Sequence, residues 1–442
     1  MKFKLLKNLM QQTASRFCTS SLKYFVISAF AVSFVLTGCE GDKAEIEKSK
    51  QEITKLQAEL NKLKKDIPTP GKDIKIGLIG ALSGPYSVYG NQTVTGFEMG
   101  LEYLTNGTMK IDGRKIVILK RDTQTKPAIG KQVLTSLYQD ENVDLVVGPV
   151  SSGVATACLP VAKQFKKILL VEPAVASNIT GKDYNRYIFK TSRNSYHDGI
   201  SNALARVKPG TYAMGIAQNY AFGKSGVEAF ELGVKQAGGT YLGSELLPLK
   251  TNDFSAPYQR IVKKFKKYKG DKVLFVIWAG AGDPIGKIKR MKPMERQGID
   301  VFTGGNIMAA LKAYLKYEGM EGSTYYYYKI PENPMNDWLV EQHMKRHSIP
   351  PDFFTAGGMA AASAIVTAIR SAGSTDTEKL IATMESMRFY TPKGVMQFRK
   401  EDHQAMQDMY HFKSTNFDGI DHGVPVLQRV IRAGDMQIPI DN

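Results

Sequence analysis

Residues 74–85 read IKIGLIGALSGP, and this stretch determines the predicted fold. A continuous run of apolar and glycine residues is typical of a strand that is buried on both faces of a parallel sheet. The run ends in small and hydroxyl-bearing residues. The stretch therefore predicts the first strand of an α/β domain, followed by a loop from which backbone and hydroxyl groups can reach a ligand.

Similar apolar runs follow, separated by amphipathic helical patterns. In the first part of the chain we expect strands at residues 115–122, 145–150, 168–174 and 187–192. A second series is expected at residues 211–219, 240–248, 272–280, 300–305 and 323–330. Buried strands that alternate with helices indicate parallel sheets covered on both faces. The predicted fold class is thus α/β, with two doubly wound parallel-sheet lobes.

The loops at the carboxyl ends of these strands share one composition. They read LSGPYSVYG, GPVSSG, PAVASN, WAGAGD and GGN. In open parallel sheets, ligands bind beyond the carboxyl ends of the strands. Small residues let backbone amides approach a ligand, hydroxyls fix polar atoms, and aromatic rings cover apolar parts. The loops therefore predict a binding cleft.

Upstream of this body, residues 44–67 carry isoleucine and leucine at heptad spacing, with Ser49 as an interruption. Such a pattern predicts a helix, and Pro68 and Pro70 close it. We expect residues 39–71 to form a stalk. Two interpretations stay open: a spacer, or a coiled coil through which residues 44–67 self-associate.

The first 38 residues have the features of a secretory signal. Residues 1–23 carry only positive charge, and the apolar run at residues 24–36 is too short to span a bilayer. The sequence Leu36-Thr37-Gly38-Cys39 resembles a bacterial lipobox. By that resemblance Cys39 becomes the lipidated first residue of the mature protein, which would hold the protein on a membrane.

The net charge and the cysteine content exclude few classes of function. The 442-residue chain has a formal net charge of +17, part of which lies in the leader. The densest basic stretch, Lys263–Lys272, is either a solvated helix face or a patch that touches anionic headgroups. Cys158 is the only cysteine of the body, and its helical, apolar context favours a buried core residue. We expect no nucleic-acid partner.

Several loop motifs, in order and spacing, resemble the periplasmic type I solute-binding proteins of the leucine/isoleucine/valine-binding family, which serve ABC importers. The motifs are Gly80–Pro85 with Tyr89-Gly90, Gly148–Ser152, Pro173–Ala176, Asn252–Ser255, and Gly394–Arg399 with Asp402–Gln404. The resemblance covers roughly residues 73–430. It implies two lobes joined by three crossovers, near residues 191, 325 and 400. Lobe 1 would then comprise residues 72–191 and 327–400, and lobe 2 residues 192–326 and 401–442.

The resemblance also implies the ligand-binding residues. Ser151, Ser152 and the segment Ala174-Val175-Ala176 would hold a ligand oxygen through backbone amides and a hydroxyl. Tyr89 from lobe 1, and Phe222 and Trp278 from lobe 2, would cover the ligand. Two alternatives stay open: the two lobe 2 rings could be ordinary core, and Ser151 could only cap the helix after it.

Two departures from the family pattern bear on the ligand. Amino-acid binders of this family place an acidic residue after the strand that here reads VFTGG, whereas this chain has Asn306. Ala176 replaces a hydroxyl residue. An amide cannot balance a buried ammonium group, so these departures favour an uncharged or anionic ligand over an amino acid.

The predicted function is an extracytoplasmic, lipid-anchored solute-binding protein that delivers a small organic solute to ABC permease subunits. The alternative is a sensory module that presents the bound solute to a membrane kinase or chemoreceptor. The sequence has no GxSxG elbow and no HExxH motif. We therefore expect no enzymatic activity, no catalytic residues, no cofactor and no metal.

Overall fold

The computed structural model describes residues 51, 54–55, 71–280, 282, 284–305 and 307–442. The predicted signal peptide, Cys39, nearly all of the stalk and Asn306 lie outside the described residues. Residues Lys72–Asn442 form one compact unit.

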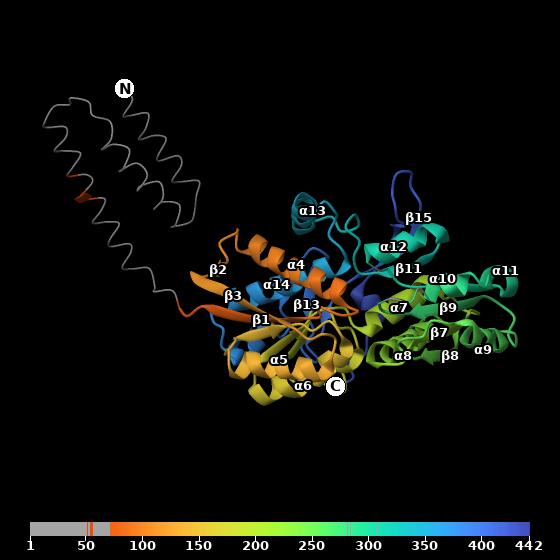
Figure 1. Ribbon diagram of the computed structural model, residues 1–442, viewed down its shortest axis with the longest axis horizontal. Helices are drawn as coiled ribbons and strands as arrows, with labels where there is room; N and C mark the ends of the chain where they lie inside the picture. The colour runs from red at the N-terminus through yellow and green to blue at the C-terminus, as the bar shows by residue number, and fades with distance from the viewer. Residues whose placement is uncertain (1–50, 52–53, 56–70, 281, 283, 306) are drawn as a thin grey trace, which may run out of the picture. The chain divides into compact units, whose positions relative to one another are not determined.

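The first sheet of this unit has the strand order β2-β3-β1-β4-β5-β6. Figure 1 shows its strands β2, β3 and β1 side by side. Its strands are β1 (Ile74–Gly80), β2 (Lys110–Ile111), β3 (Arg114–Asp122), β4 (Leu145–Val147), β5 (Ile168–Val171) and β6 (Ile188–Lys190). All pairs are parallel except the edge pair β2–β3. Strand β1 pairs with β3 on one side and with β4 on the other, so the chain reverses its direction of winding at β1. Loops diverge at such a switch point and leave a crevice.

Four helices pack on this sheet or on one another: α4 (Ser87–Leu104), α5 (Pro127–Gln139), α6 (Ser152–Phe165) and α14 (Phe353–Ala372). Apolar strand residues and the alanine-rich face of α14 form the core. Among the described helices, only α14 is long and apolar enough to cross a membrane, but 89% of its apolar window is buried within the protein. It is therefore a core helix.

The second sheet has the order β10-β9-β7-β8 and is parallel throughout. Its strands are β7 (Tyr212–Gln218), β8 (Thr240–Leu247), β9 (Lys272–Ile277) and β10 (Ile299–Phe302). An apolar cluster covers each face. The accompanying helices are α7 (Ser195–Arg206), α8 (Ala221–Gln236), α9 (Ser255–Phe265), α10 (Pro284–Lys289), α11 (Pro293–Gln297) and α12 (Met308–Tyr314). The switch point of this sheet lies at β7.

Two small antiparallel sheets complete the fold. One has the order β11-β15-β16 and the other β12-β13-β14. Their strands are β11 (Glu321–Thr324), β12 (Arg388–Thr391), β13 (Gly394–Phe398), β14 (Ala405–Met406), β15 (Met409–Thr415) and β16 (Val424–Ile431). The remaining helices are α13 (Pro334–His347), α15 (Thr377–Met384) and the 3₁₀ turns η1 (Ser177–Ile179), η2 (Leu315–Tyr317) and η3 (Ala433–Met436).

The chain passes between the two halves of the unit three times, after β6, β11 and β14. Two parallel sheets and three crossings confirm the predicted fold class. The third crossing follows Met406, beyond the predicted position near residue 400, because β14 still pairs with β13. The exact bounds of the two lobes stay a prediction.

The expected strand at residues 323–330 is wrong for most of its length. Strand β11 ends at Thr324 and is antiparallel to β15. Tyr325 donates a hydrogen bond to the Phe353 carbonyl at 2.6 Å, and Tyr326 donates one to the Asn336 side chain at 2.8 Å. The hydroxyl of Tyr327 is hydrogen-bonded to His422 at 2.9 Å. These consecutive buried tyrosines bond to separate elements, which fixes a turning segment.

The contact between α4 and α14 depends on glycines. A Cβ atom on Gly96 would lie 1.8 Å from the carbonyl oxygen of Thr355, and one on Gly358 would lie 2.1 Å from that of Thr93. The two helix backbones therefore approach more closely than any side chain at these positions allows.

Gly96→Ala tests this packing. Because the new methyl group would meet backbone atoms, it should lower the free energy of unfolding by about 1–3 kcal/mol. Gly153→Ala is the control, since its Cβ would have Ser151 Oγ at 3.9 Å as its nearest neighbour, an ordinary contact. Alanine there should be neutral or stabilise α6 by up to about 1 kcal/mol. Urea denaturation measures both, and equal effects would contradict the close helix contact.

Candidate functional site

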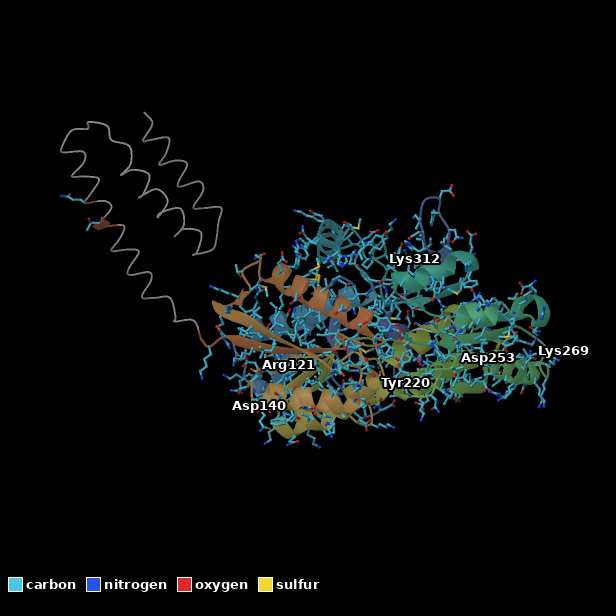
Figure 2. The ribbon with its side chains drawn as sticks, in the orientation of Figure 1. Arg121, Asp140, Tyr220, Asp253, Lys269 and Lys312 are labelled. Carbon is cyan, nitrogen blue, oxygen red and sulfur yellow. The ribbon has the colours of Figure 1, made fainter. Side chains whose placement is uncertain are left out.

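A cavity of about 110 Å³ lies where the loops of the two parallel sheets meet. From the first sheet it is lined by residues after β1, β4 and β5, and from the second by residues after β7, β9 and β10. Figure 2 shows one lining residue, Tyr220, in the middle of the unit, whereas Lys269 lies at its far end. The cavity thus lies at the switch points of both sheets.

Aromatic rings and hydroxyls form the wall from the first sheet. Tyr86 and Tyr89 are stacked, with ring centroids 5.6 Å apart, and Tyr89 also contacts Phe354 at 4.6 Å. Ser151 and Ser152, at the start of α6, line the same cavity. This wall offers apolar faces beside polar atoms.

The wall from the second sheet is also aromatic. It includes Tyr220, Phe222 and Trp278, and the Trp278 ring meets Phe254 edge to face at 5.2 Å. The side chain of Gln218 holds the two loops of this wall together. Its Oε1 accepts a bond from the Ala279 amide at 3.0 Å, and its Nε2 donates to the Ala279 carbonyl at 3.1 Å.

Hydrogen bonds join the two walls. The hydroxyls of Tyr86 and Tyr220 lie 3.2 Å apart, and the Gly280 amide donates to the Tyr89 hydroxyl at 2.8 Å. A third link joins the Ser177 and Ser225 hydroxyls at 2.8 Å. The structure is therefore a closed form of the cleft, held by polar contacts that opening would exchange for water.

The predicted oxygen-binding segment makes bonds within the protein. The Ser152 hydroxyl accepts hydrogen bonds from the amides of Val175 and Ala176, at 3.3 and 3.2 Å. The Ala174 amide donates to the Pro149 carbonyl at 3.2 Å. Ser151 occupies the N-cap position of α6, but its side chain makes no capping bond.

Most of the predicted site residues come together at this cavity. Tyr89, Ser151, Ser152, Val175, Phe222 and Trp278 line it. Ala174 and Ala176 are fully buried behind the lining and take part through backbone bonds. Asn306 lies outside the described residues. Phe222 and Trp278 line the cavity and also pack against the apolar clusters of the second sheet.

Two charged residues of the cavity are absent from the sequence-based prediction. Arg193 follows β6 at the first crossing, and Asp198 lies in the first turn of α7. Arg193 Nε donates to Asp198 Oδ1 at 2.8 Å. The Arg193 guanidinium also lies 4.7 Å from the ring centre of Tyr325 and 4.8 Å from that of Phe353. The sequence signal was an Arg and an Asp just after a strand end at a predicted crossover.

Further charges lie behind the lining. Lys190 is fully buried and donates to the Ala176 carbonyl at 3.1 Å, and Glu172 accepts a bond from the Thr191 hydroxyl at 3.0 Å. Burial, with Arg193 nearby, lowers the pKa of Lys190 to about 7, and burial raises the pKa of Glu172. The acids Glu172, Asp198 and Asp402 act in the opposite direction on the pKa of Lys190. In the described part of the chain, no group of three or more His, Cys, Asp or Glu side chains could hold a metal ion.

The pH dependence of stability tests the burial of Lys190. Its pKa is about 7 in the folded state and 10.5 at its ordinary value, so the unfolded chain binds more protons between these pH values. The free energy of unfolding should then rise with pH, by up to about 1.4 kcal/mol per unit. Lys190→Met lacks this titration. Urea denaturation from pH 7 to 9 should show wild type gaining stability relative to the variant, and a constant difference would contradict a neutral folded-state lysine.

Ser152→Ala tests the serine that holds the β5 loop. The substitution leaves the Val175 and Ala176 amides without their acceptor, which should lower the free energy of unfolding by about 1–3 kcal/mol. Ser151→Ala, one residue away in the same cavity wall, removes no capping bond and should change stability by less than about 0.5 kcal/mol. Thermal unfolding compares the two, and a larger effect at Ser151 would contradict this assignment.

Comparison with known proteins identifies the fold. A family model described as "Periplasmic binding protein" matches residues 73–419. A Leu/Ile/Val-binding protein homolog from Brucella melitensis is 26% identical over 349 residues, which cover 76% of this chain and 86% of that protein.

Solved structures of similar proteins have the same fold. The crystal structure of an ABC-type branched-chain amino acid transporter from Rhodopseudomonas palustris is 53% identical and has a TM-score of 0.77, covering 84% of this chain and all of that one. A solute-binding protein from the same species, in complex with 3,4-dihydroxybenzoic acid, shares the fold with a TM-score of 0.70 at 24% identity, over 82% of this chain and 98% of that one. This chain therefore belongs to the periplasmic binding protein family and is an extracytoplasmic solute-binding protein of an ABC transporter.

Proposed function

We propose that the cavity described above is the solute site, and that it holds a small organic solute, either an amino acid or an aromatic acid. The observation that carries the proposal is that loops from the switch points of both sheets close on one cavity. Sites in open α/β sheets form at switch points, and solutes of this size are held by apolar walls with few polar groups. The relatives named above include one described as a Leu/Ile/Val-binding protein homolog and one in complex with an aromatic acid.

Each wall has a role in this proposal. Tyr89 from one wall, and Phe222 and Trp278 from the other, cover the apolar part of the solute. Ser151 and Ser152, with Asn306, provide polar groups, and the Ala174–Ala176 segment supports Ser152 through the Val175 and Ala176 amides. Because these groups come from both halves of the unit, a bound solute would add contacts that stabilise the closed form. The permease would then receive the closed, loaded protein.

The chain before Lys72 would place this receptor at a membrane. The lipobox-like sequence supports lipidation of Cys39, and the heptad pattern of residues 44–67 supports a helical stalk, as a spacer or as a self-associating segment. We infer no enzymatic activity, in keeping with relatives that are transport proteins.

A ligand screen tests the proposed function. Amino acids, organic acids, aromatic acids and amides should include at least one compound that raises the melting temperature. At a hundred times its Kd a ligand adds about 2.7 kcal/mol to the stability of the native state. If no amino acid and no aromatic acid shifts the melting temperature, the proposed solute class is wrong.

Tryptophan fluorescence then locates the site. The chain has two tryptophans, of which Trp278 lines the cavity while Trp338 packs on Tyr103 at 5.1 Å. In Trp338→Phe, which retains Trp278, the ligand should change the emission. In Trp278→Phe, which retains Trp338, it should not. The reverse pattern would place the ligand elsewhere.

A further inference from the structure

A basic surface lies at the end of the second sheet that is remote from the cavity. Helix α9 ends at Phe265 and strand β9 begins at Lys272, so the segment between them lies at the edge where β9 starts, opposite to the cavity edge. Figure 2 shows Lys269 at this far end of the unit. The segment has six lysines, which we call the basic end face: Lys263, Lys264, Lys266, Lys267, Lys269 and Lys272.

Aromatic and apolar contacts fix this segment to the body. Phe265 is 1% exposed and belongs to the apolar cluster under α9. The ring of Tyr268 packs on that of Tyr212, with the ring centroids 4.6 Å apart. All six lysines except Lys272, which is half-buried, are exposed to solvent. The positive charges are therefore held together on one surface.

The charge of the basic end face is not balanced by neighbouring acids. Asp271, the one acid of the segment, forms its ion pair with Lys208 at 2.9 Å. Lys263, Lys266, Lys267 and Lys269 form no ion pair with any described residue. A solvated helix face would account for Lys263 and Lys264, since lysines are favourable at the C-terminal end of a helix. It does not account for the lysines beyond the end of α9.

An exposed apolar side chain lies at the same end of the unit. Met294, on α11, is 55% exposed. It lines a hollow of about 660 Å³ together with residues 270–273, which follow Lys269. Figure 1 shows α9 and α11 at this end. Protein surfaces that bind membranes combine basic side chains with apolar ones that enter the boundary between headgroups and acyl chains. Met294 supplies the apolar component.

We propose that the basic end face, together with Met294, binds the surface of a membrane that contains anionic phospholipids. The inference goes beyond the proposed solute site and does not depend on which solute is bound. Each lysine near an anionic membrane surface strengthens binding by about fivefold, and the attraction is screened by salt. The contact would hold the second sheet beside the bilayer in which the permease lies.

The end of α6 in the first sheet provides a matched control. It also carries several lysines, at 163, 166 and 167. Lys167 donates to the Val143 carbonyl at 3.1 Å, which places it beside a segment that carries acids. These acids are Asp140, Glu141 and Asp144. Because the lysines at this end have acids next to them, we expect them to make no contact with the membrane.

Lysine acetylation tests the inference on the full-length chain. The protein is mixed with vesicles of phosphatidylcholine, with or without about 30% phosphatidylglycerol, and mass spectrometry gives the acetylation rate of each lysine. The anionic vesicles should slow acetylation of Lys266, Lys267 and Lys269 at least about fivefold, and salt at about 1 M should abolish this protection. Lys163 and Lys166 should react equally with both vesicles. The readout is local, so it does not depend on how the residues before Lys72 attach to a vesicle.

Two triple variants separate the basic end face from total charge. Combining Lys263→Gln, Lys266→Gln and Lys267→Gln should remove the protection of Lys269. Combining Lys131→Gln, Lys163→Gln and Lys166→Gln, on α5 and α6, removes the same charge and should preserve that protection.

Three results would overturn the inference. The first is equal acetylation of the basic end face on the two kinds of vesicle, which would assign this surface to a protein partner or to water. The second is protection of Lys163 as strong as that of Lys269, and the third is protection of Lys269 that survives the first triple variant. The wild-type comparison of the two vesicles decides the question even if a variant does not fold.

Discussion

A parallel sheet presents its ligand-facing loops at one edge, where the strand order reverses, and this constraint acts twice in the present structure. Strands β1 and β4 end at the switch point of the first sheet, and β7 and β9 at that of the second. The loops after them form facing walls of one cavity. The rest of the site depends on this arrangement, because each loop is short and gains its position from a buried strand. The carboxamide of Gln218 illustrates the point, since it locks the β7 end to the β9 loop.

The two cavity walls and the segments that cross between the sheets contribute different types of side chain. The walls contribute rings and hydroxyls, which adapt to a solute and also bond across the closed cleft, as Tyr86 does with Tyr220. The crossings contribute the charges. Arg193 and Asp198 lie where the chain first leaves the first sheet, and Lys190 and Glu172 are buried just behind them. Asp198 therefore lies on the segment that connects the two parallel sheets.

Sequence patterns predicted the regular part of the fold well. The expected strands of both parallel sheets lie within a few residues of the observed ones, because a strand buried on both faces requires an apolar run. The tyrosine run after residue 324 has the composition of a strand, yet it turns, because each hydroxyl binds a different element. Short antiparallel strands such as β14 carry too few residues for a periodic signal.

The site was predictable only in part, because many of its contacts, like those of the tyrosine run, join elements that are distant in the sequence. Loop residues next to a strand end, such as Ser152 and Trp278, can be assigned to a cleft from their position in the chain. The exchange of bonds between Ser152 and the β5 loop, and the pairing of Arg193 with Asp198, depend on how the chain folds around the crossing. A pattern of residue types does not encode these distances.

A crystal structure of residues 72–442 with a bound solute from the screen tests the central claim most directly. The account predicts density for the solute between the two walls, in contact with Tyr89 on one side and Trp278 on the other. Density at a different place on the surface, with this cavity empty or filled by side chains, would contradict it.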